Sequence, residues 1–370
     1  MENQRKSFNA AMASYFIIVT LFVVFRLLSS FGLLQFLGGA GDYVWSIVIQ
    51  IVLLLGGSIF LYSAFKKQKP KFTIKEFGMR KVSGKVVWLC IALGFVVFFI
   101  NLFVSSAFNG LIELLGYEHN YSGGSTSYSF GMLIVNLIFT AVLPGICEEV
   151  AHRGMLLKSL TPLGTGKAIF LSALFFGLLH INIEQFFYAT IIGLFLGVLT
   201  IVSGSIIPAM IVHFMNNALS VYLSFSAVNG LPFAKIVAFF ESAIYSNIFL
   251  GMLIAILLLL GLSYLAIYLT KKVAILRLKD DLNAAQNYIS RQIMRDSYML
   301  EVETAKLEVA DVERSIVSEE ILDRLKDFIV NDNILENKKF KMPIYGKILL
   351  FGALFMGVVL TIFTFVWGVL

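Results

Sequence analysis

The stretch FGMLIVNLIFTAVLPGICEEVAHRGMLL, residues 130–157, decides what kind of fold this chain can adopt. Its first part, 130–146, is almost entirely apolar and suits a helix that crosses a lipid bilayer. Two carboxylates, a histidine and an arginine then follow at 148–153, before the apolar pattern resumes. Ionisable groups inside a membrane are costly to insert, so such a cluster indicates a functional site by default.

The composition of the whole chain also indicates a membrane protein. Of the 370 residues, 58% are hydrophobic and 14% are charged, whereas soluble domains are nearer half apolar with about 25% charged. No segment shows the alternating pattern of membrane barrel strands. The sequence therefore predicts an all-α fold, a polytopic membrane helix bundle of about eight or nine spanning helices. The apolar runs place these near 12–34, 43–65, 86–109, 129–157, 167–184, 186–203, 205–227, 246–270 and 347–369.

Basic residues indicate how the bundle is oriented. The loop KKQKPKFTIKEFGMRKVSGK, residues 66–85, contains a single acid, and the other basic loops fall on the same side if the spans alternate. The positive-inside rule then predicts a multi-pass protein of the plasma membrane with a cytoplasmic N-terminus. The first apolar run lacks a small-residue cleavage site, so we expect it to be retained as a helix. Because the positive charge lies in these loops, nucleic acid is not an expected partner.

Residues 271–346 break the apolar pattern. They are charged, balanced in sign and amphipathic at helical spacing, which predicts a cytoplasmic helical insertion, in its simplest form a hairpin. It would either dock a cytoplasmic partner or act as a solvated spacer. The expected organisation is N-terminal membrane helices at 1–128, a membrane core at 129–227, a further membrane helix at 228–270, the insertion at 271–346 and a last membrane helix at 347–370.

Three polar positions from different spans reach similar depths. Counted from the nearest basic or turn residue at the cytoplasmic edge, Glu148, His180 and His213 lie ~15, ~20 and ~12 Å deep at about 1.5 Å per residue. A hydrocarbon core is about 30 Å thick, so all three fall near its middle. We therefore expect one site formed by three helices.

The spacing around these residues favours catalysis but does not decide between a metal-free mechanism and one that uses Zn²⁺. Phe176 precedes His180, and Asn217 follows His213, each by one helical turn. A carboxylate and a histidine can make a water nucleophilic, and an imidazole N–H and an amide can donate to an oxyanion. Alternatively, Glu148, His180 and His213 could bind Zn²⁺ with one open position.

The residues next to Glu148 are interpreted mainly as structural. Glu149 and Arg153 suit an ion pair at i,i+4, whereas His152 shares a face with Glu148 and would either tune that carboxylate, add a ligand or simply pack. Cys147 and Cys90 both lie in expected spans, so a disulfide framework is not expected, and Cys147 is interpreted as inert packing rather than as a nucleophile.

Taken together, three short motifs resemble the CPBP family, which includes type II CAAX prenyl endopeptidases, bacteriocin-processing proteins and abortive-infection proteins. They are EEVAHR at 148–153, FGLLH at 176–180 and HFMNN at 213–217. The resemblance implies an intramembrane endopeptidase, commonly called a metalloprotease although a metal-free glutamate mechanism is also argued for the family. It covers about 129–225. By that resemblance Glu148 and His180 activate water, His213 and Asn217 stabilise the oxyanion, and Glu149 and Arg153 hold the helices.

The resemblance does not identify the substrate, and the residues also suit two other functions. A membrane-associated peptide or protein in the bilayer is the expected substrate, prenylated or not. The first alternative is a proton-coupled transporter whose Glu and His residues relay protons. The second is a non-catalytic scaffold or immunity protein that acts through residues 271–346.

Overall fold

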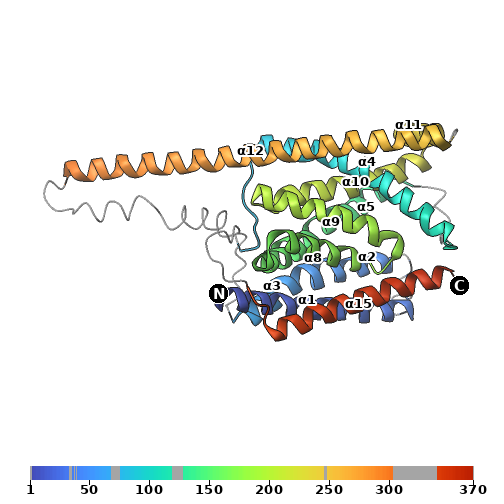
Figure 1. Cartoon of the computed structure of the whole chain (residues 1–370), viewed down its shortest axis with the longest axis horizontal. Coiled ribbons are helices and arrows are strands. Elements are labelled where there is room, and N and C mark those ends of the chain that lie inside the picture. Colours follow the sequence, from blue (N-terminus) through green and yellow to red (C-terminus); the bar gives the residue numbers. More distant parts are fainter. Residues whose placement is uncertain are drawn as a thin grey trace.

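The computed structural model describes residues 2–32, 36, 38, 40–67, 76–118, 128–245, 248–302 and 340–369. Every regular element in these residues is a helix, which confirms the all-α prediction (Figure 1). The α-helices are α1 (Glu2–Ser30), α2 (Ala40–Ile47), α3 (Ser58–Phe65), α4 (Gly84–Leu114), α5 (Phe130–Leu137), α6 (Leu143–Glu149), α7 (Lys158–Leu160), α8 (Thr165–Leu178), α9 (Ile183–Ser203), α10 (Ile207–Val228), α11 (Pro232–Tyr245), α12 (Ile248–Val302) and α15 (Ile344–Val369). Three π-helices, η2 (Val48–Gly57), η3 (Ile138–Val142) and η4 (Val150–Leu157), and the 3-10 turn η5 (Thr161–Leu163) complete them.

Consecutive elements join into rods that are long enough to cross a bilayer. Residues 40–65 form one rod from α2, η2 and α3, and residues 130–163 form another from α5 to η5. Eight helices within the described residues have the length and apolar composition of a membrane span. The predicted bundle of about eight or nine spanning helices is therefore confirmed.

The expected span at 167–184 is the exception. The helix there, α8, has 14 residues, so it is about 21 Å long, shorter than the about 30 Å of a hydrocarbon core. It ends at Leu178, and the chain turns before α9 begins at Ile183. The predicted span is therefore wrong after Leu178, where a loop replaces the expected end of the helix.

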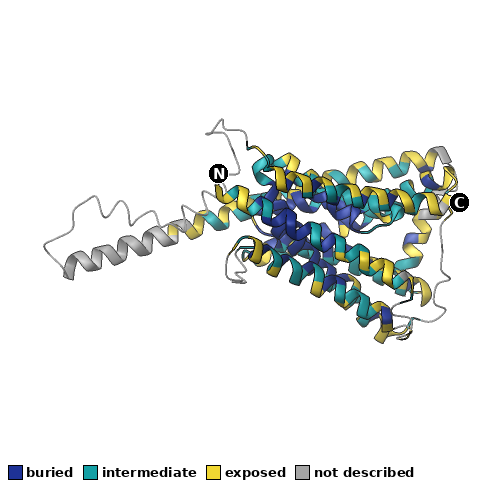
Figure 2. Ribbon diagram, turned by 90° about the horizontal axis from the view of Figure 1, so that it is seen from below, coloured by how far each residue is buried: buried dark blue, intermediate teal, exposed yellow. Residues whose placement is uncertain are grey.

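Two buried clusters hold the rods together. One joins α1, η2, η4, α8 and α15, and the other joins α4, α9, α10 and α12. Buried residues gather in the middle of the bundle, while exposed residues line its outer faces (Figure 2). Large apolar side chains are exposed on those outer faces, including Trp88 and Leu250, as expected of surfaces that face lipid.

One end of the bundle gathers the basic loops. The Ile206 N–H donates to the Gly78 carbonyl at 3.0 Å, and Lys158 Nζ donates to the Glu76 carbonyl at 3.2 Å. The N-terminus lies at the same end and the C-terminus at the other (Figure 1). Loops that the positive-inside rule assigns to one side of the membrane therefore lie on one side of the structure.

The long helix α12 passes this end and continues beyond it (Figure 1). It has 55 residues, or about 80 Å, far more than a bilayer requires. The expected boundary at residue 271 falls inside this helix and does not coincide with a break. Residues 303–339, about half of the expected insertion, lie outside the described residues, so the expected hairpin stays a prediction.

Candidate active site

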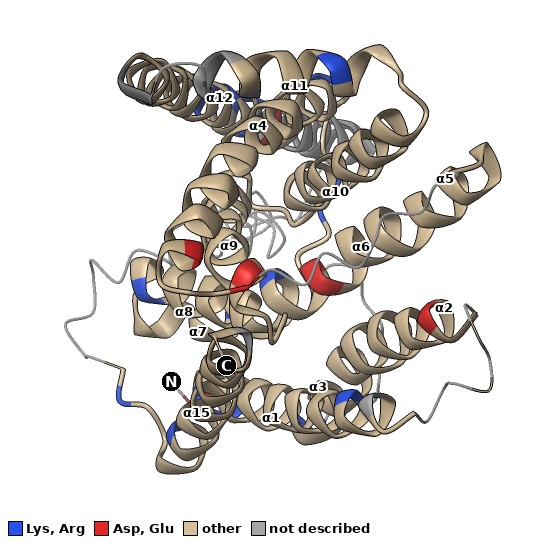
Figure 3. Ribbon diagram, turned by 90° about the vertical axis from the view of Figure 1, so that its right-hand side faces the viewer, with Lys and Arg blue, Asp and Glu red and all other residues tan. Residues whose placement is uncertain are grey.

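The four ionisable residues of 148–153 are buried at the junction of α6 and η4. Glu148 and Glu149 are the last residues of α6, and His152 and Arg153 lie in η4. All four are at most 6% exposed. In the view along the helices, an acidic position lies inside the bundle beside α6, where most ribbons carry neither sign of charge (Figure 3).

Glu149 connects three elements. Its Oε1 accepts from Arg153 Nη1 at 2.8 Å and from His213 Nδ1 at 2.9 Å. Arg153 Nη2 donates to the Gly193 carbonyl of α9 at 3.1 Å. The ion pair predicted at i,i+4 is therefore present, and it also fixes His213 of α10 in place.

The contact with Glu149 determines which nitrogen of His213 is free to react. A carboxylate only accepts, so Nδ1 carries a hydrogen in either protonation state of the ring. Nε2 is then the ring nitrogen that can either carry or lack a hydrogen. It faces Glu148 Oε2 at 3.9 Å, which is too long for a hydrogen bond and suits one bridging water.

Glu148 has one occupied and one unoccupied carboxylate oxygen. Its Oε1 accepts from Gln50 Nε2 of η2 at 2.7 Å. Its Oε2 is buried and has no hydrogen-bond partner among the described residues. A buried carboxylate oxygen needs a donor, and a water between Oε2 and His213 Nε2 would supply one.

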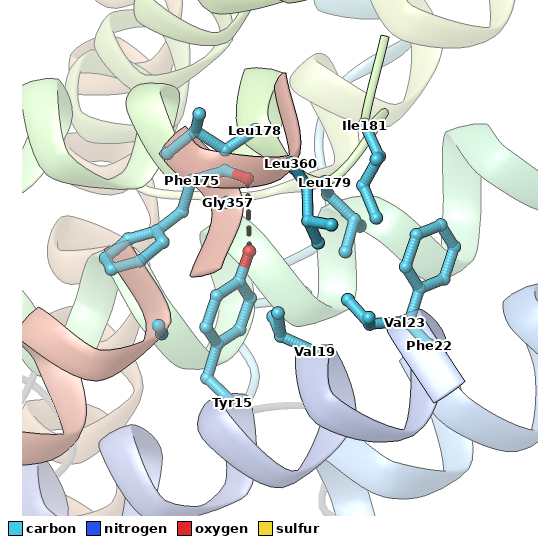
Figure 4. Close-up of a pocket in the computed structure, with 11 residues that line it drawn as sticks. Tyr15, Val19, Phe22, Val23, Phe175, Leu178, Leu179, Ile181, Gly357 and Leu360 are labelled. Carbon is cyan, nitrogen blue, oxygen red and sulfur yellow. Dashed lines mark hydrogen bonds between the residues drawn. The ribbon is translucent and has the colours of Figure 1, made fainter. Parts of the chain in front are cut away.

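His152 faces α1 rather than the carboxylate of Glu148. Its Nδ1 donates to the Glu148 backbone carbonyl at 2.9 Å, and its Nε2 lies 3.2 Å from the Tyr15 hydroxyl. The same hydroxyl donates to the Phe175 carbonyl at 3.1 Å (Figure 4), so its single hydrogen is shared between two acceptors. Nδ1 of His152 is thus engaged within its own helical rod, and Nε2 links that rod to α1.

The Phe176 ring forms the centre of the site. The rings of His152, His180 and His213 meet it edge to face, with centroids 5.2, 5.4 and 5.5 Å away. The Arg153 guanidinium lies over the ring at 4.5 Å. One aromatic side chain therefore spaces three histidines and an arginine that come from three different segments.

His180 lies in the turn that ends α8. Its ring is partly buried and makes no hydrogen bond with the described residues. The next residue, Ile181, has a φ of 46°, which is uncommon for a β-branched residue. Asn182 then caps α9, its side chain accepting from the Glu184 N–H at 2.9 Å.

Asn217 lies one turn beyond His213 and faces η3. Its Nδ2 donates to the Thr140 carbonyl at 3.1 Å, and its Oδ1 accepts from Asn216 Nδ2 at 3.0 Å. Asn216 in turn accepts from Asn101 of α4 at 3.3 Å. One N–H of the Asn217 amide is used by Thr140, which leaves the second for another acceptor.

The donor set does not form a three-ligand metal site as placed. Within the described residues, no group of three or more His, Cys, Asp or Glu side chains is arranged to hold a metal ion. Glu148 and His213 present two donor atoms 3.9 Å apart, and Gln50 takes the other oxygen of Glu148. Of the expected trio, His180 and His213 lie against Phe176, and together with Glu148 they do not form such a group.

Sequence reasoning missed Gln50, Tyr15 and the asparagines Asn101 and Asn216. Gln50 had a signal, since it interrupts the apolar run VIQIVLLL with a single amide. Tyr15 had none, because a lone tyrosine in an apolar helix is ordinary. Neither cysteine forms a disulfide, and both are buried, in agreement with the prediction.

Comparison with known families supports the resemblance over the same region. Residues 130–219 match the family model described as type II CAAX prenyl endopeptidase Rce1-like. No curated protein and no solved structure matches the chain. The matched residues run from the start of α5 into α10 and contain Glu148, His180 and His213. Residues 130–219 are therefore similar to the Rce1-like type II CAAX prenyl endopeptidases, the family that their three motifs resemble.

Proposed function

We propose that the protein is an intramembrane endopeptidase that hydrolyses a peptide bond of a membrane-associated protein or peptide. The observation that carries this proposal is the pair formed by Glu148 Oε2 and His213 Nε2, which face each other at 3.9 Å. Both atoms are buried between helices that span the membrane. A water held between them would lie within hydrogen-bond reach of both groups and be separated from bulk solvent.

The reaction follows from the atoms that surround this water. Glu148 Oε2 accepts a proton as the water oxygen attacks the carbonyl carbon of the substrate. The carbonyl oxygen becomes an oxyanion, and N–H groups of His213 and Asn217 are the proposed donors to it. When the C–N bond breaks, the amine takes the proton from Glu148, which restores the carboxylate. His180, whose ring meets Phe176 edge to face, is proposed to act with Glu148 in activating the water.

Glu149 and Arg153 have a supporting role in this proposal. They hold the Nδ1 hydrogen of His213 toward Glu149, so that Nε2 faces Glu148 Oε2 and the proposed water. Arg153 balances the charge of Glu149 at 2.8 Å. The charge of Glu148 is then the one that changes during catalysis.

A comparison of membrane peptides tests the proposal. Membranes that contain the wild type, Glu148→Gln or Glu118→Gln are profiled by mass spectrometry. Glu118 is exposed at the far end of α4 and serves as the matched control. We expect a precursor to accumulate only with Glu148→Gln, because loss of a general base costs about 10²- to 10⁴-fold in rate. Equal profiles for all three proteins would rule out the proposed site.

Metal dependence is tested on the purified protein with the substrate that this profile identifies. Because the candidate ligands do not converge, we expect cleavage to persist after treatment with a zinc chelator. Loss of cleavage that added Zn²⁺ restores would instead favour Glu148, His180 and His213 as ligands.

The proposed location is the plasma membrane, with the N-terminus in the cytoplasm. Its support is the gathering of the basic loops and the N-terminus at one end of the bundle. Under this proposal, the long extension of α12 also projects into the cytoplasm, where it could contact a partner.

A further inference from the structure

Gln50 contacts the candidate site from outside the matched family segment. It lies in η2, within residues 48–57, whereas the family match begins at residue 130. Its side chain is 8% exposed, in a run whose other members are aliphatic residues and glycines. A buried amide in a membrane span loses hydrogen bonds to water, so it is retained only where a partner compensates.

The partner is the carboxylate that the proposed reaction uses. Gln50 Nε2 donates to Glu148 Oε1 at 2.7 Å, a charge-assisted hydrogen bond. This bond occupies one oxygen and restricts rotation of the carboxylate. The other oxygen, Oε2, is then the one that faces His213.

The neighbouring residues fix the position of Gln50. One turn earlier, Ser46 Oγ donates to the Phe139 carbonyl of η3 at 3.3 Å, and the Tyr43 ring packs on Phe139 with centroids 4.9 Å apart. These contacts set the register of the α2–η2 rod against the α5–η5 rod. π-Helical segments are rare and are frequently found at functional sites, and η2 has ten residues.

We propose that Gln50 is a positioning residue that holds Glu148 so that Oε2 activates the water. This inference rests on the proposed function, because it assigns Gln50 a role in the same reaction. It also means that residues 130–219 alone do not complete the site, which requires the rod formed by residues 40–65.

The test measures kcat and KM for variants that keep or remove the donor. Gln50→Met keeps the volume and removes the N–H groups, and Gln50→Asn keeps an amide that is one methylene too short. A charge-assisted hydrogen bond of ordinary strength predicts that both lower kcat by about 10- to 100-fold, with KM within about threefold of the wild type. Gln50→His retains an N–H at similar reach and should recover part of kcat.

Two controls separate this role from folding and from the proposed function. Val52→Ala alters a lipid-exposed side chain of the same π-helix and should leave kcat unchanged. A thermal shift in detergent verifies that each variant is folded, and Gln50→Asn decides the test if Gln50→Met does not accumulate.

The outcomes are distinguishable. Wild-type kcat in Gln50→Met beside an inactive Glu148→Gln overturns the role of Gln50 and leaves the proposed function intact. Equal losses in Gln50→Met and Gln50→His, together with lower melting temperatures in both, also overturn it in favour of a purely structural amide. Absence of cleavage by the wild type overturns the proposed function, and the role of Gln50 with it.

Discussion

Arg153 is the residue on which the buried charges of the site depend. It is 1% exposed, and it contacts one carboxylate oxygen of Glu149, the carbonyl of Gly193 and the face of Phe176 simultaneously. A buried ion pair contributes little net stability compared with apolar residues, but removal of one partner leaves the other charged and unpaired. The ion pair therefore specifies a geometry more than it adds stability.

We predict that Arg153→Met lowers the free energy of unfolding by about 3–5 kcal/mol, because buried Glu149 loses the guanidinium that balances its charge. Arg153→Lys should recover only part of this loss, since an ammonium cannot reproduce the planar fork that contacts Gly193 and Phe176. In the double variant Arg153→Met/Glu149→Gln, we expect part of the stability to return. Denaturant titration of the three proteins in detergent measures the difference. A double variant less stable than Arg153→Met would contradict this explanation.

At the scale of single residues, sequence predicted the local pairs and missed the distant ones. The Glu149–Arg153 pair and the Phe176–His180 pair follow from helical spacing, and the structure contains both. Gln50 and Tyr15 meet their partners across 98 and 137 residues of chain. No periodicity specifies which faces of two distant helices meet, so these contacts required the fold.

Among the elements, α8 determines where His180 lies. The apolar run at 167–184 predicts one long span, since it contains no proline and its single glycine, Gly177, is tolerated inside a helix. The turn depends instead on the cap by Asn182, a weak signal that is visible in sequence as an asparagine before an apolar run. Because α8 is short, His180 ends up inside the bundle at the level of the other site residues.

The packing of α8 against α9 gives a prediction with a matched control on the same helix. A Cβ on Gly177 would collide with Thr190 Oγ1 and would lie 2.7 Å from the Phe186 carbonyl. Gly177 also accepts the hydrogen bond from the His180 N–H, so a shift of this turn would move His180. We expect Gly177→Ala to lower stability by about 1–3 kcal/mol and to reduce cleavage at least tenfold.

The control is Gly166→Ala, where a Cβ would meet no atom within 4 Å. Alanine is favoured over glycine in a helix by up to about 1 kcal/mol, so this variant should be at least as stable as the wild type and equally active. Thermal melting and cleavage rates of the two variants provide the comparison. Equal behaviour of Gly166→Ala and Gly177→Ala would mean that close packing at Gly177 does not position His180.

The whole molecule is polarised along its helix axes. The basic loop, the end of α7 and the continuation of α12 meet at one end, where Arg277 Nη1 donates to the Lys81 carbonyl at 2.7 Å. The opposite end carries the loop after α4, whose sequence contains few basic residues. Composition alone predicted this division, because lysine and arginine counts report on topology without any knowledge of packing.

The proposed orientation predicts which end a membrane-impermeant maleimide can reach. The native cysteines Cys90 and Cys147 are buried, so labelling of the wild type should be low. Lys81 and Glu118 are exposed at opposite ends of α4. In spheroplasts, we expect Glu118→Cys to be labelled at once and Lys81→Cys only after lysis. The reverse pattern would place the N-terminus outside the cell, and it would also mean that the charges of the 66–85 loop do not set the topology of this chain.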